Sequence, residues 1–214
     1  MAADVLGLMD ALGLPRAHLL GHDRGARVAY RFALDHPDRL DRLGIIEILT
    51  TADYWDRFDA GMAMAIWHWT FLAQPAPLPE RMIGADPALF AKTLLGRWTR
   101  EKSIDALPAG SVSAYVAQMS DPVRVAAMCA DYRAGATIDR AHDKADRTAG
   151  RRITAPLHFL YAESGFPARA PDPPAAWRAW ADRVTASSCR AGHFVVEENP
   201  QAVLDAFIPH FRSV

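Results

Sequence analysis

The chain has 214 residues, of which 50% are hydrophobic and 23% charged, an ordinary composition for a globular protein. Its formal net charge of −1 excludes a general attraction to nucleic acid or to an anionic membrane. No apolar run approaches the ~20 residues that a membrane-spanning helix needs. The first residues include acids and no basic leader, so we expect no signal peptide. Cys129 and Cys189 form no CxxC pair, which favours a reduced, cytoplasmic setting without a structural metal.

The first fifty residues alternate between helical and strand patterns. Residues 2–13 have the apolar spacing of an amphipathic helix, and the short apolar run 17–20 follows. Residues 26–34 return to a helical pattern, and residues 43–48 are continuously apolar except for Glu47. A helix–strand–helix–strand order of this kind predicts a parallel sheet.

Strand patterns disappear between residues 51 and 150, where the sequence is helical and rich in aromatic residues. They return at residues 156–161 and weakly at 184–188, with a helix between them, a loop at 191–194 and a closing helix at 200–211. We therefore expect an α/β core formed by residues 1–50 and 151–214, interrupted by an all-helical cap of residues 51–150.

The segment Gly21-His22-Asp23-Arg24-Gly25 lies between a predicted strand and a predicted helix. This pattern matches the nucleophile elbow of α/β hydrolases, with Asp where most of these enzymes have Ser. The two glycines would let the strand turn sharply and the helix pack closely. Asp23 would lie at the helix N-terminus, where backbone N–H groups stabilise negative charge. A surface turn with an Asp cap is the simpler alternative, and the flanking elements disfavour it.

A carboxylate nucleophile changes the expected reaction. Asp23 would displace a leaving group from carbon and form an alkyl ester with the enzyme, and a His-activated water would hydrolyse that ester. Dehalogenation and epoxide opening fit this scheme, whereas ordinary ester hydrolysis by acyl transfer fits it poorly.

The base is expected in a loop after the last strand, because the chain order in this fold is nucleophile, acid, histidine. His193 lies between the last strand pattern and the last helix, and it is the one histidine with that context. His18 and His158 lie in predicted strands, and His36 lies in a turn.

The acid that orients the base is less clearly marked. Glu47 ends an apolar strand 24 residues after Asp23, and a buried charge there needs a partner such as His193. A capping or salt-bridge role is the alternative for Glu47. Glu163, at the end of the next predicted strand, is the second candidate for the acid.

Four segments resemble the fluoroacetate (haloacetate) dehalogenases of the α/β-hydrolase superfamily. They are GHDRGARVAY at residues 21–30, WHW at 67–69, FLAQPAPLPER at 71–81 and GHF at 192–194. The resemblance implies that Asp23 is the nucleophile, that His193 is the base, and that Arg24 and Arg27 clamp the substrate carboxylate. Residues i and i+3 of a helix share a face, and paired guanidinium groups select anions. The alternative for the arginines is a solvated helix face that pairs with Asp35 or Asp38.

The resemblance also assigns residues of the helical insert. His68, Trp69 and Tyr132 would hold the leaving halide, and Trp98 matches a further aromatic residue of the cap. Fluoride is strongly hydrated and leaves poorly, so several N–H and O–H donors in a dry pocket suit this chemistry. The alternative is that these side chains are simply the core of the cap.

The resemblance implies a haloacid substrate, no metal, no organic cofactor and a homodimer. The net charge and the cysteine usage favour a cytoplasmic protein without a nucleic-acid or membrane partner. The sequence departs from the family in having Glu47 where Asp is usual. In the family, four strands and a helix precede the first helix of this chain, which amounts to roughly 80 residues. They include the loop that supplies the second oxyanion-hole N–H. We therefore expect residues 1–214 alone to have a partial sheet, to be poorly soluble and to release no fluoride.

Two other functions stay open. An epoxide hydrolase of the same superfamily would need tyrosines to protonate the epoxide oxygen, and Tyr115 and Tyr132 are available, although the arginine pair argues against a neutral substrate. The second alternative is an inactive, truncated polypeptide.

Overall fold

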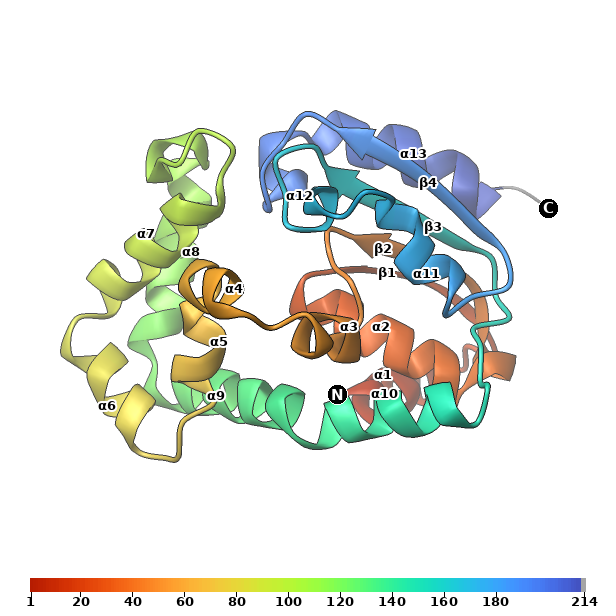
Figure 1. Cartoon of the computed structure of the whole chain (residues 1–214), viewed down its shortest axis with the longest axis horizontal. Coiled ribbons are helices and arrows are strands. Elements are labelled where there is room, and N and C mark those ends of the chain that lie inside the picture. Colours follow the sequence, from red (N-terminus) through yellow and green to blue (C-terminus); the bar gives the residue numbers. More distant parts are fainter. Residues whose placement is uncertain (213–214) are drawn as a thin grey trace. The chain divides into compact units, whose positions relative to one another are not determined.

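The computed structural model describes residues 1–212. The chain forms two compact units, of which unit 1 comprises Met1–Thr50 and Asp146–Val214, and unit 2 comprises Thr51–Ala145. Figure 1 shows the elements of both along the chain. Whether these units act as the expected core and cap domains stays a prediction.

A four-stranded parallel sheet forms the centre of unit 1 within the described residues. Its order is β1 (Ala17–His22), β2 (Leu40–Ile46), β3 (Leu157–Ala162) and β4 (Val184–Cys189). Gly21 pairs with Ile45, Ile46 pairs with Leu160, and Ala162 pairs with Cys189. Because the strands are parallel, their carboxyl ends meet at one edge of the sheet, where loops can bring distant residues together.

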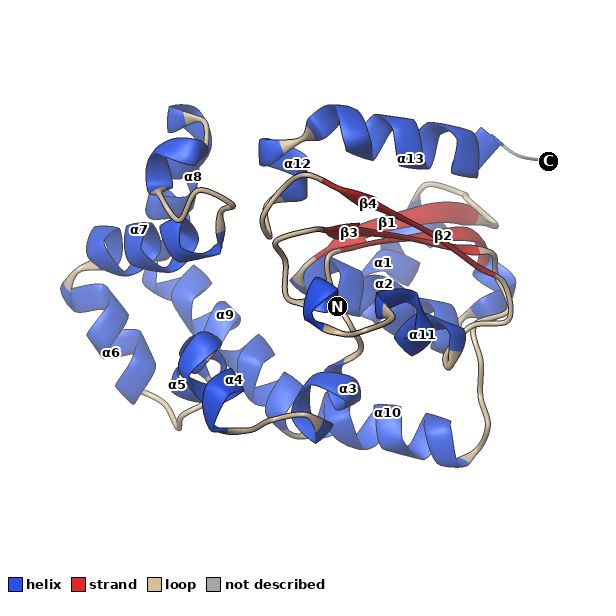
Figure 2. Ribbon diagram, turned by 45° about the horizontal axis from the view of Figure 1, so that its top comes forward, coloured by secondary structure: helices blue, strands red, loops and turns tan. Residues whose placement is uncertain are grey.

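Helices cover both faces of the sheet of unit 1 (Figure 2). The helices α1 (Ala2–Ala11), α2 (Arg24–Asp35) and α11 (Pro173–Arg178) lie on one side, and α12 (Val195–Glu198) and α13 (Pro200–Arg212) lie on the other. The first layer includes Tyr30, Phe32, Phe159 and Trp177, all at most 2% exposed. Burial of large aromatic and aliphatic side chains on both faces of the sheet is the main stabilising contribution to such a layer.

The predicted apolar stripe of the first helix is only partly buried. Met9 is 4% exposed, whereas Leu8 and Leu12 are 60% and 62% exposed. The helix packs against α2 with the side that carries Met9. Leu8 and Leu12 therefore contribute little to the core, whereas Val5 and Leu6 pack against it.

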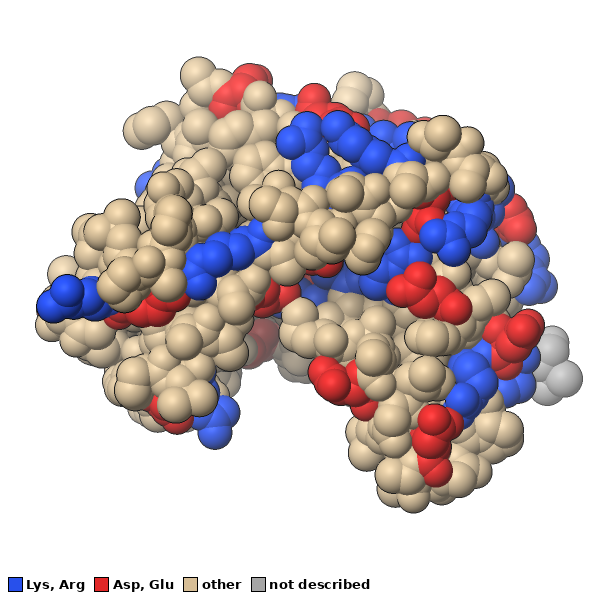
Figure 3. Space-filling model, turned by 90° about the horizontal axis from the view of Figure 1, so that it is seen from below, with Lys and Arg blue, Asp and Glu red and all other residues tan. Residues whose placement is uncertain are grey.

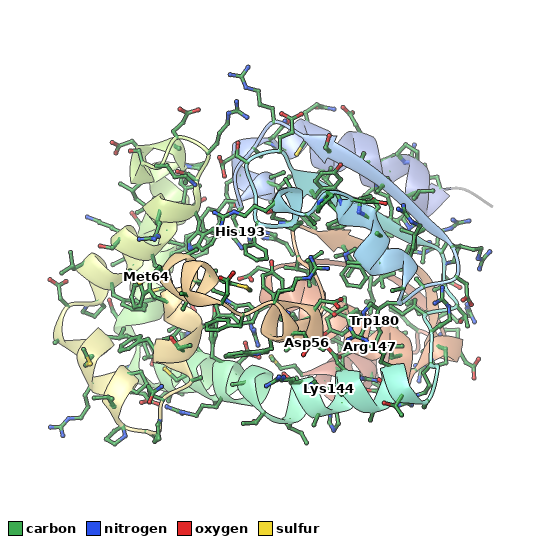
Figure 4. The ribbon with its side chains drawn as sticks, viewed as in Figure 1. Asp56, Met64, Lys144, Arg147, Trp180 and His193 are labelled. Carbon is green, nitrogen blue, oxygen red and sulfur yellow. The ribbon has the colours of Figure 1, made fainter. Side chains whose placement is uncertain are left out.

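The last residues of α10 (Ile138–Thr148) belong to unit 1 and contain a buried carboxylate. Asp146 is fully buried, and its Oδ2 lies 2.6 Å from Nη1 of Arg31, while Arg151 contacts its other oxygen. The next residue, Arg147, lies with its guanidinium 5.0 Å from the ring centre of Trp180, and Figure 4 shows the two together. A cation over an aromatic face adds a favourable contact within unit 1.

Unit 2 contains helices and no strand among the described residues 51–145. The helices are α3 (Thr51–Asp56), α4 (Ala60–Ala65), α5 (Trp67–Leu72), α6 (Leu78–Ala85), α7 (Pro87–Trp98), α8 (Ala109–Ser120), α9 (Pro122–Ala136) and most of α10.

Local sequence signals set several helix starts in unit 2. Asp59, Asp86 and Asp121 each accept a backbone N–H two or three residues ahead, at 2.7, 2.9 and 2.9 Å. Asp86 and Asp121 are each followed by a proline at the first helical position, where the missing N–H costs nothing.

The surface charges are mixed. On the face in Figure 3, basic and acidic side chains lie beside one another at several places. Ion pairs among the described residues include Lys144 with Asp56, at 3.6 Å in unit 2. In residues 1–212, no helix combines the length and the apolar character required to cross a membrane.

Candidate active site

Asp23 lies in a strained turn between β1 and α2. Its φ of 49° and ψ of −119° place it in a region that residues with a side chain rarely adopt. A Cβ on Gly21 would lie 2.5 Å from Cα of Ala26, so this turn requires glycine at position 21. Gly25 differs from the expectation, because it is exposed and, within the described structure, no atom lies near the place of its Cβ. The close packing therefore rests on Gly21.

His193 faces Asp23 from the loop after β4, and Figure 4 marks its place. Its Nε2 lies 3.7 Å from Oδ1 of Asp23, which is an ion-pair distance and longer than a hydrogen bond. The side chains of His193 and Asp23 are 17% and 40% exposed. This loop position is the one that the sequence predicts for the base.

The charges of the two groups stabilise each other. Burial works to raise the pKa of Asp23, but His193, His22 and Arg24 outweigh it and hold that pKa well below its usual range. Burial works to lower the pKa of His193, but the carboxylates of Asp23 and Glu47 outweigh it, and the pKa lies above its usual value. Asp23 is therefore ionised at neutral pH, as a carboxylate nucleophile must be.

Glu47 follows directly after β2 and is fully buried. Its backbone has a φ of 59°, and its Oε2 accepts the N–H of Ala162 at 2.6 Å. Burial raises the pKa of Glu47 to about 7, and the nearby positive charge of His193 acts in the opposite direction. The other candidate acid, Glu163, is exposed.

Gly165 makes room for the carboxylate of Glu47. A Cβ on Gly165 would overlap the carboxyl group, with Oε2 only 2.7 Å away, so any other residue would displace the acid. No local pattern marks this requirement, because Gly165 and Glu47 lie on different strand ends. The sequence alone shows only that position 165, two residues after Glu163, carries no side chain.

Two further residues hold the loop of His193, and sequence reasoning gave neither of them a role. Nε2 of His22 lies 2.8 Å from the backbone oxygen of His193. The carboxylate of Glu198 accepts the N–H of Gly192 at 3.0 Å and the N–H of Phe194 at 3.2 Å. His22 lies inside the elbow motif and Glu198 follows the GHF segment, but no spacing rule connects them to the base.

The two arginines of the elbow begin α2. Arg24 is its first residue, and its charge helps to lower the pKa of Asp23. Arg27 is 6% exposed, its Nη1 donates to the carbonyl of Leu49 at 3.4 Å, and its charge acts on His193. Asp35 pairs with Arg31 at 2.7 Å. A buried Arg27 is inconsistent with the alternative of a solvated helix face.

The predicted residues of the helical insert gather within unit 2. His68, at 7% exposed, contacts Trp98 and Tyr132 edge to face, with ring centres 6.0 and 5.9 Å apart. The rings of Trp69 and Tyr132 also meet edge to face, with their centres 6.2 Å apart. The structure thus brings together Asp23, Glu47, His193 and the two arginines in unit 1, and a separate aromatic cluster (His68, Trp69, Trp98, Tyr132) in unit 2.

The α/β hydrolase fold family matches residues 1–200. The chain belongs to this family. The predicted parallel α/β fold is therefore confirmed, and the family supports hydrolase activity. A solved structure of an α/β hydrolase from Nostoc sp. PCC 7120 is 37% identical to this chain, with a TM-score of 0.94. The match covers 100% of this chain and 72% of the Nostoc chain.

Curated relatives of this α/β hydrolase include enzymes with two different reactions. A fluoroacetate dehalogenase from Burkholderia sp. is 37% identical over 216 residues, which cover 100% of this chain and 70% of the relative. A soluble epoxide hydrolase from Corynebacterium sp. (strain C12) is 29% identical over 222 residues, which cover 100% and 73%. One name gives fluoroacetate and the other an epoxide as the substrate of that relative.

Proposed function

We propose that this α/β hydrolase removes halide from haloacetates in two steps, with Asp23 as nucleophile and His193 as base. The observation that carries the proposal is the ionised Asp23 in the elbow, 3.7 Å from His193 and flanked by Arg24 and Arg27. The identity to a fluoroacetate dehalogenase supports the choice of haloacetates.

In the first step, a carboxylate oxygen of Asp23 attacks the carbon that carries the halogen. The carbon–halogen bond breaks with its electron pair, halide leaves, and an alkyl ester of Asp23 forms. This step needs an ionised Asp23 and no proton transfer. The low pKa of Asp23 keeps the carboxylate available throughout the neutral range.

In the second step, His193 takes a proton from water, and the resulting hydroxide attacks the ester carbonyl of Asp23. The ester bond breaks, and the protonated His193 gives its proton to the departing alkoxide oxygen, so that the hydroxyacid leaves. The Asp23 carboxyl group then loses its proton to solvent, which restores the carboxylate. Overall, haloacetate and water give glycolate, halide and a proton. The N–H of Arg24, next to the nucleophile, is the expected donor to the oxyanion that forms on Asp23.

The first step prepares the second by removing a charge. Ionised Asp23 raises the pKa of His193, and this favours the protonated imidazole, which cannot act as a base. Once Asp23 is an ester, that charge is gone and the pKa of His193 falls. Glu47 is then the remaining carboxylate that acts on His193 and orients it.

We propose that two contacts select the substrate: one with the negative charge at one end of the haloacid and one with the halogen at its other end. Arg24 and Arg27 would hold the carboxylate of the haloacid through charge-assisted hydrogen bonds. The aromatic cluster of unit 2 would supply N–H and O–H donors to the halide. We also propose a homodimer in the cytoplasm with no metal or organic cofactor.

Epoxide opening is the second candidate. It is supported by the epoxide hydrolase relative and by Tyr132, a buried phenol in the aromatic cluster that could protonate an epoxide oxygen. The paired arginines beside Asp23 favour an anionic substrate over a neutral epoxide.

A substrate panel with an Arg27→Gln variant separates the two candidates. In the intact protein, we expect halide release from fluoroacetate and chloroacetate, and we expect styrene oxide to stay unopened. Arg27→Gln should raise KM for chloroacetate roughly 10- to 150-fold, because a charge-assisted hydrogen bond contributes about 1.5–3 kcal/mol. Arg81→Gln, in α6, is the control for the loss of one positive charge. Diol formation without halide release would favour the epoxide hydrolase.

A further inference from the structure

The structure assigns to His22 and Glu198 the role of positioning residues that hold the loop of His193 for the water-activating step. The inference rests on the proposed function, in which His193 acts only in the hydrolysis of the ester. Neither side chain needs to touch the substrate. Each acts on the backbone at or beside His193.

His22 holds the backbone of the base directly. Its Nε2 lies 2.8 Å from the carbonyl oxygen of His193, and because a carbonyl can only accept, Nε2 carries the proton and donates. The two imidazole rings lie 4.9 Å apart with an angle of 43° between their planes. His22 is the residue before Asp23, so one side chain connects the turn of the nucleophile with the loop of the base.

The electrostatic surroundings keep His22 in this donating form. Burial and the positive charge of His193 lower its pKa, and Asp23 and Glu197 act in the opposite direction. His22 is therefore neutral at physiological pH, with one nitrogen as donor. A neutral ring can pack beside a protonated His193 at less cost than a second cation.

Glu198 holds the same loop from the other side. It lies in the short helix α12, and its two carboxylate oxygens accept the N–H groups of Gly192 and Phe194, the residues on either side of His193. With His22 on the carbonyl of His193, the peptide groups Ala191–Gly192 and His193–Phe194 are both hydrogen-bonded to side chains. This fixes the backbone from which the imidazole reaches Asp23.

The consequence for the reaction is a difference between its two steps. Displacement by Asp23 does not use His193, whereas ester hydrolysis depends on the placement of the imidazole, and small displacements of a catalytic group reduce rates strongly. Loosening the loop should slow the second step alone. A side chain that merely stabilises the fold would affect both steps or neither.

The test compares His22→Phe with His22→Gln in the full chain. Phe retains a packing ring and removes the donor, whereas Gln places an amide N–H at about the reach of Nε2. We expect His22→Phe to slow ester hydrolysis about tenfold, the usual effect of one lost hydrogen bond, with an unchanged halide burst. His22→Gln should restore most of the rate. His18→Phe, an exposed histidine on the same strand that stacks on Phe211, is the matched control.

Glu198 is tested by Glu198→Ala, with amide hydrogen exchange at Gly192 and Phe194 as the readout. Exchange at both should accelerate at least tenfold in Glu198→Ala. Hydrogen exchange needs no turnover, so it tests the role of Glu198 even if the intact wild-type protein releases no halide. The absence of halide release would reject the proposed function and not the positioning role. Unchanged exchange in Glu198→Ala, or equal slowing of both steps in a folded His22→Phe, would overturn the positioning role.

Discussion

Glu47 brings a titratable carboxyl group into a fully buried position of unit 1. Its folded-state pKa of about 7 exceeds the reference value of 4.5, so folding takes up a proton between these two values. The contribution of Glu47 to stability is therefore fully present below about pH 4.5 and is lost as the pH rises through 7. At about 1.4 kcal/mol for each pKa unit, this carboxyl group costs of order 3 kcal/mol when it is ionised.

The corresponding prediction is that Glu47→Gln gains stability relative to the wild type on going from pH 5 to pH 8. The amide has the same shape and needs no proton, so the pH-dependent cost should disappear. Urea unfolding at both pH values measures the difference. The same variant should lose most of its ester hydrolysis, because His193 loses its orienting charge. An identical pH slope in both proteins would contradict the assignment of the raised pKa.

At the scale of single elements, the packing of the last residues of α10 within unit 1 depends on one carboxylate. Asp146 is buried between Arg31 and Arg151, whereas Asp35 pairs with the same Arg31 from a half-exposed position. Asp146→Asn would remove the charge of a fully buried carboxylate that contacts two arginines, while Arg31 keeps Asp35 as its counter-ion. A charge-assisted hydrogen bond contributes about 1.5–3 kcal/mol. An exposed pair contributes at most about 1 kcal/mol.

We therefore expect Asp146→Asn to destabilise the protein by about 3 kcal/mol and Asp35→Asn by less than about 1 kcal/mol. Both variants remove one negative charge next to Arg31, so the difference between them measures burial. Urea unfolding gives the values, and hydrogen exchange at residues 146–151 should accelerate in Asp146→Asn. Equal losses of stability in the two variants would contradict the claim that the buried carboxylate of Asp146 contributes more than the exposed carboxylate of Asp35.

The elements could be predicted from the sequence because their signals are local. The apolar run before Glu47 predicts a strand, and the pattern of residues 51–150 predicts the helices of unit 2. The elbow needed the strand–turn–helix order around Asp23, which the sequence also contains. Leu8 and Leu12 show the limit of periodicity, because the apolar stripe identifies a helix and not how much of it is covered.

The site was less predictable because its supporting contacts are long-range. Gly165 is necessary only because Glu47 fills the space beside it, and His22 reaches the backbone of a residue far along the chain. Such requirements depend on which strand ends lie next to one another. The order of the strands in the sheet decides this, and the spacing of residues along the sequence does not. The resemblance to a family supplied the roles of the cap residues, for which the sequence alone offered aromatic composition.

At the scale of the whole molecule, we propose that Asp23 forms a covalent ester and that His193 is needed to remove it. The most direct test exposes a His193→Ala variant to chloroacetate and follows the intact protein and its peptides by mass spectrometry. We predict one equivalent of halide and a carboxymethyl ester on the peptide that contains Asp23, stable for the length of the experiment. No ester should form when Asp23→Asn is added. Continued turnover in His193→Ala without an ester, or an ester that persists in Asp23→Asn, would contradict the mechanism.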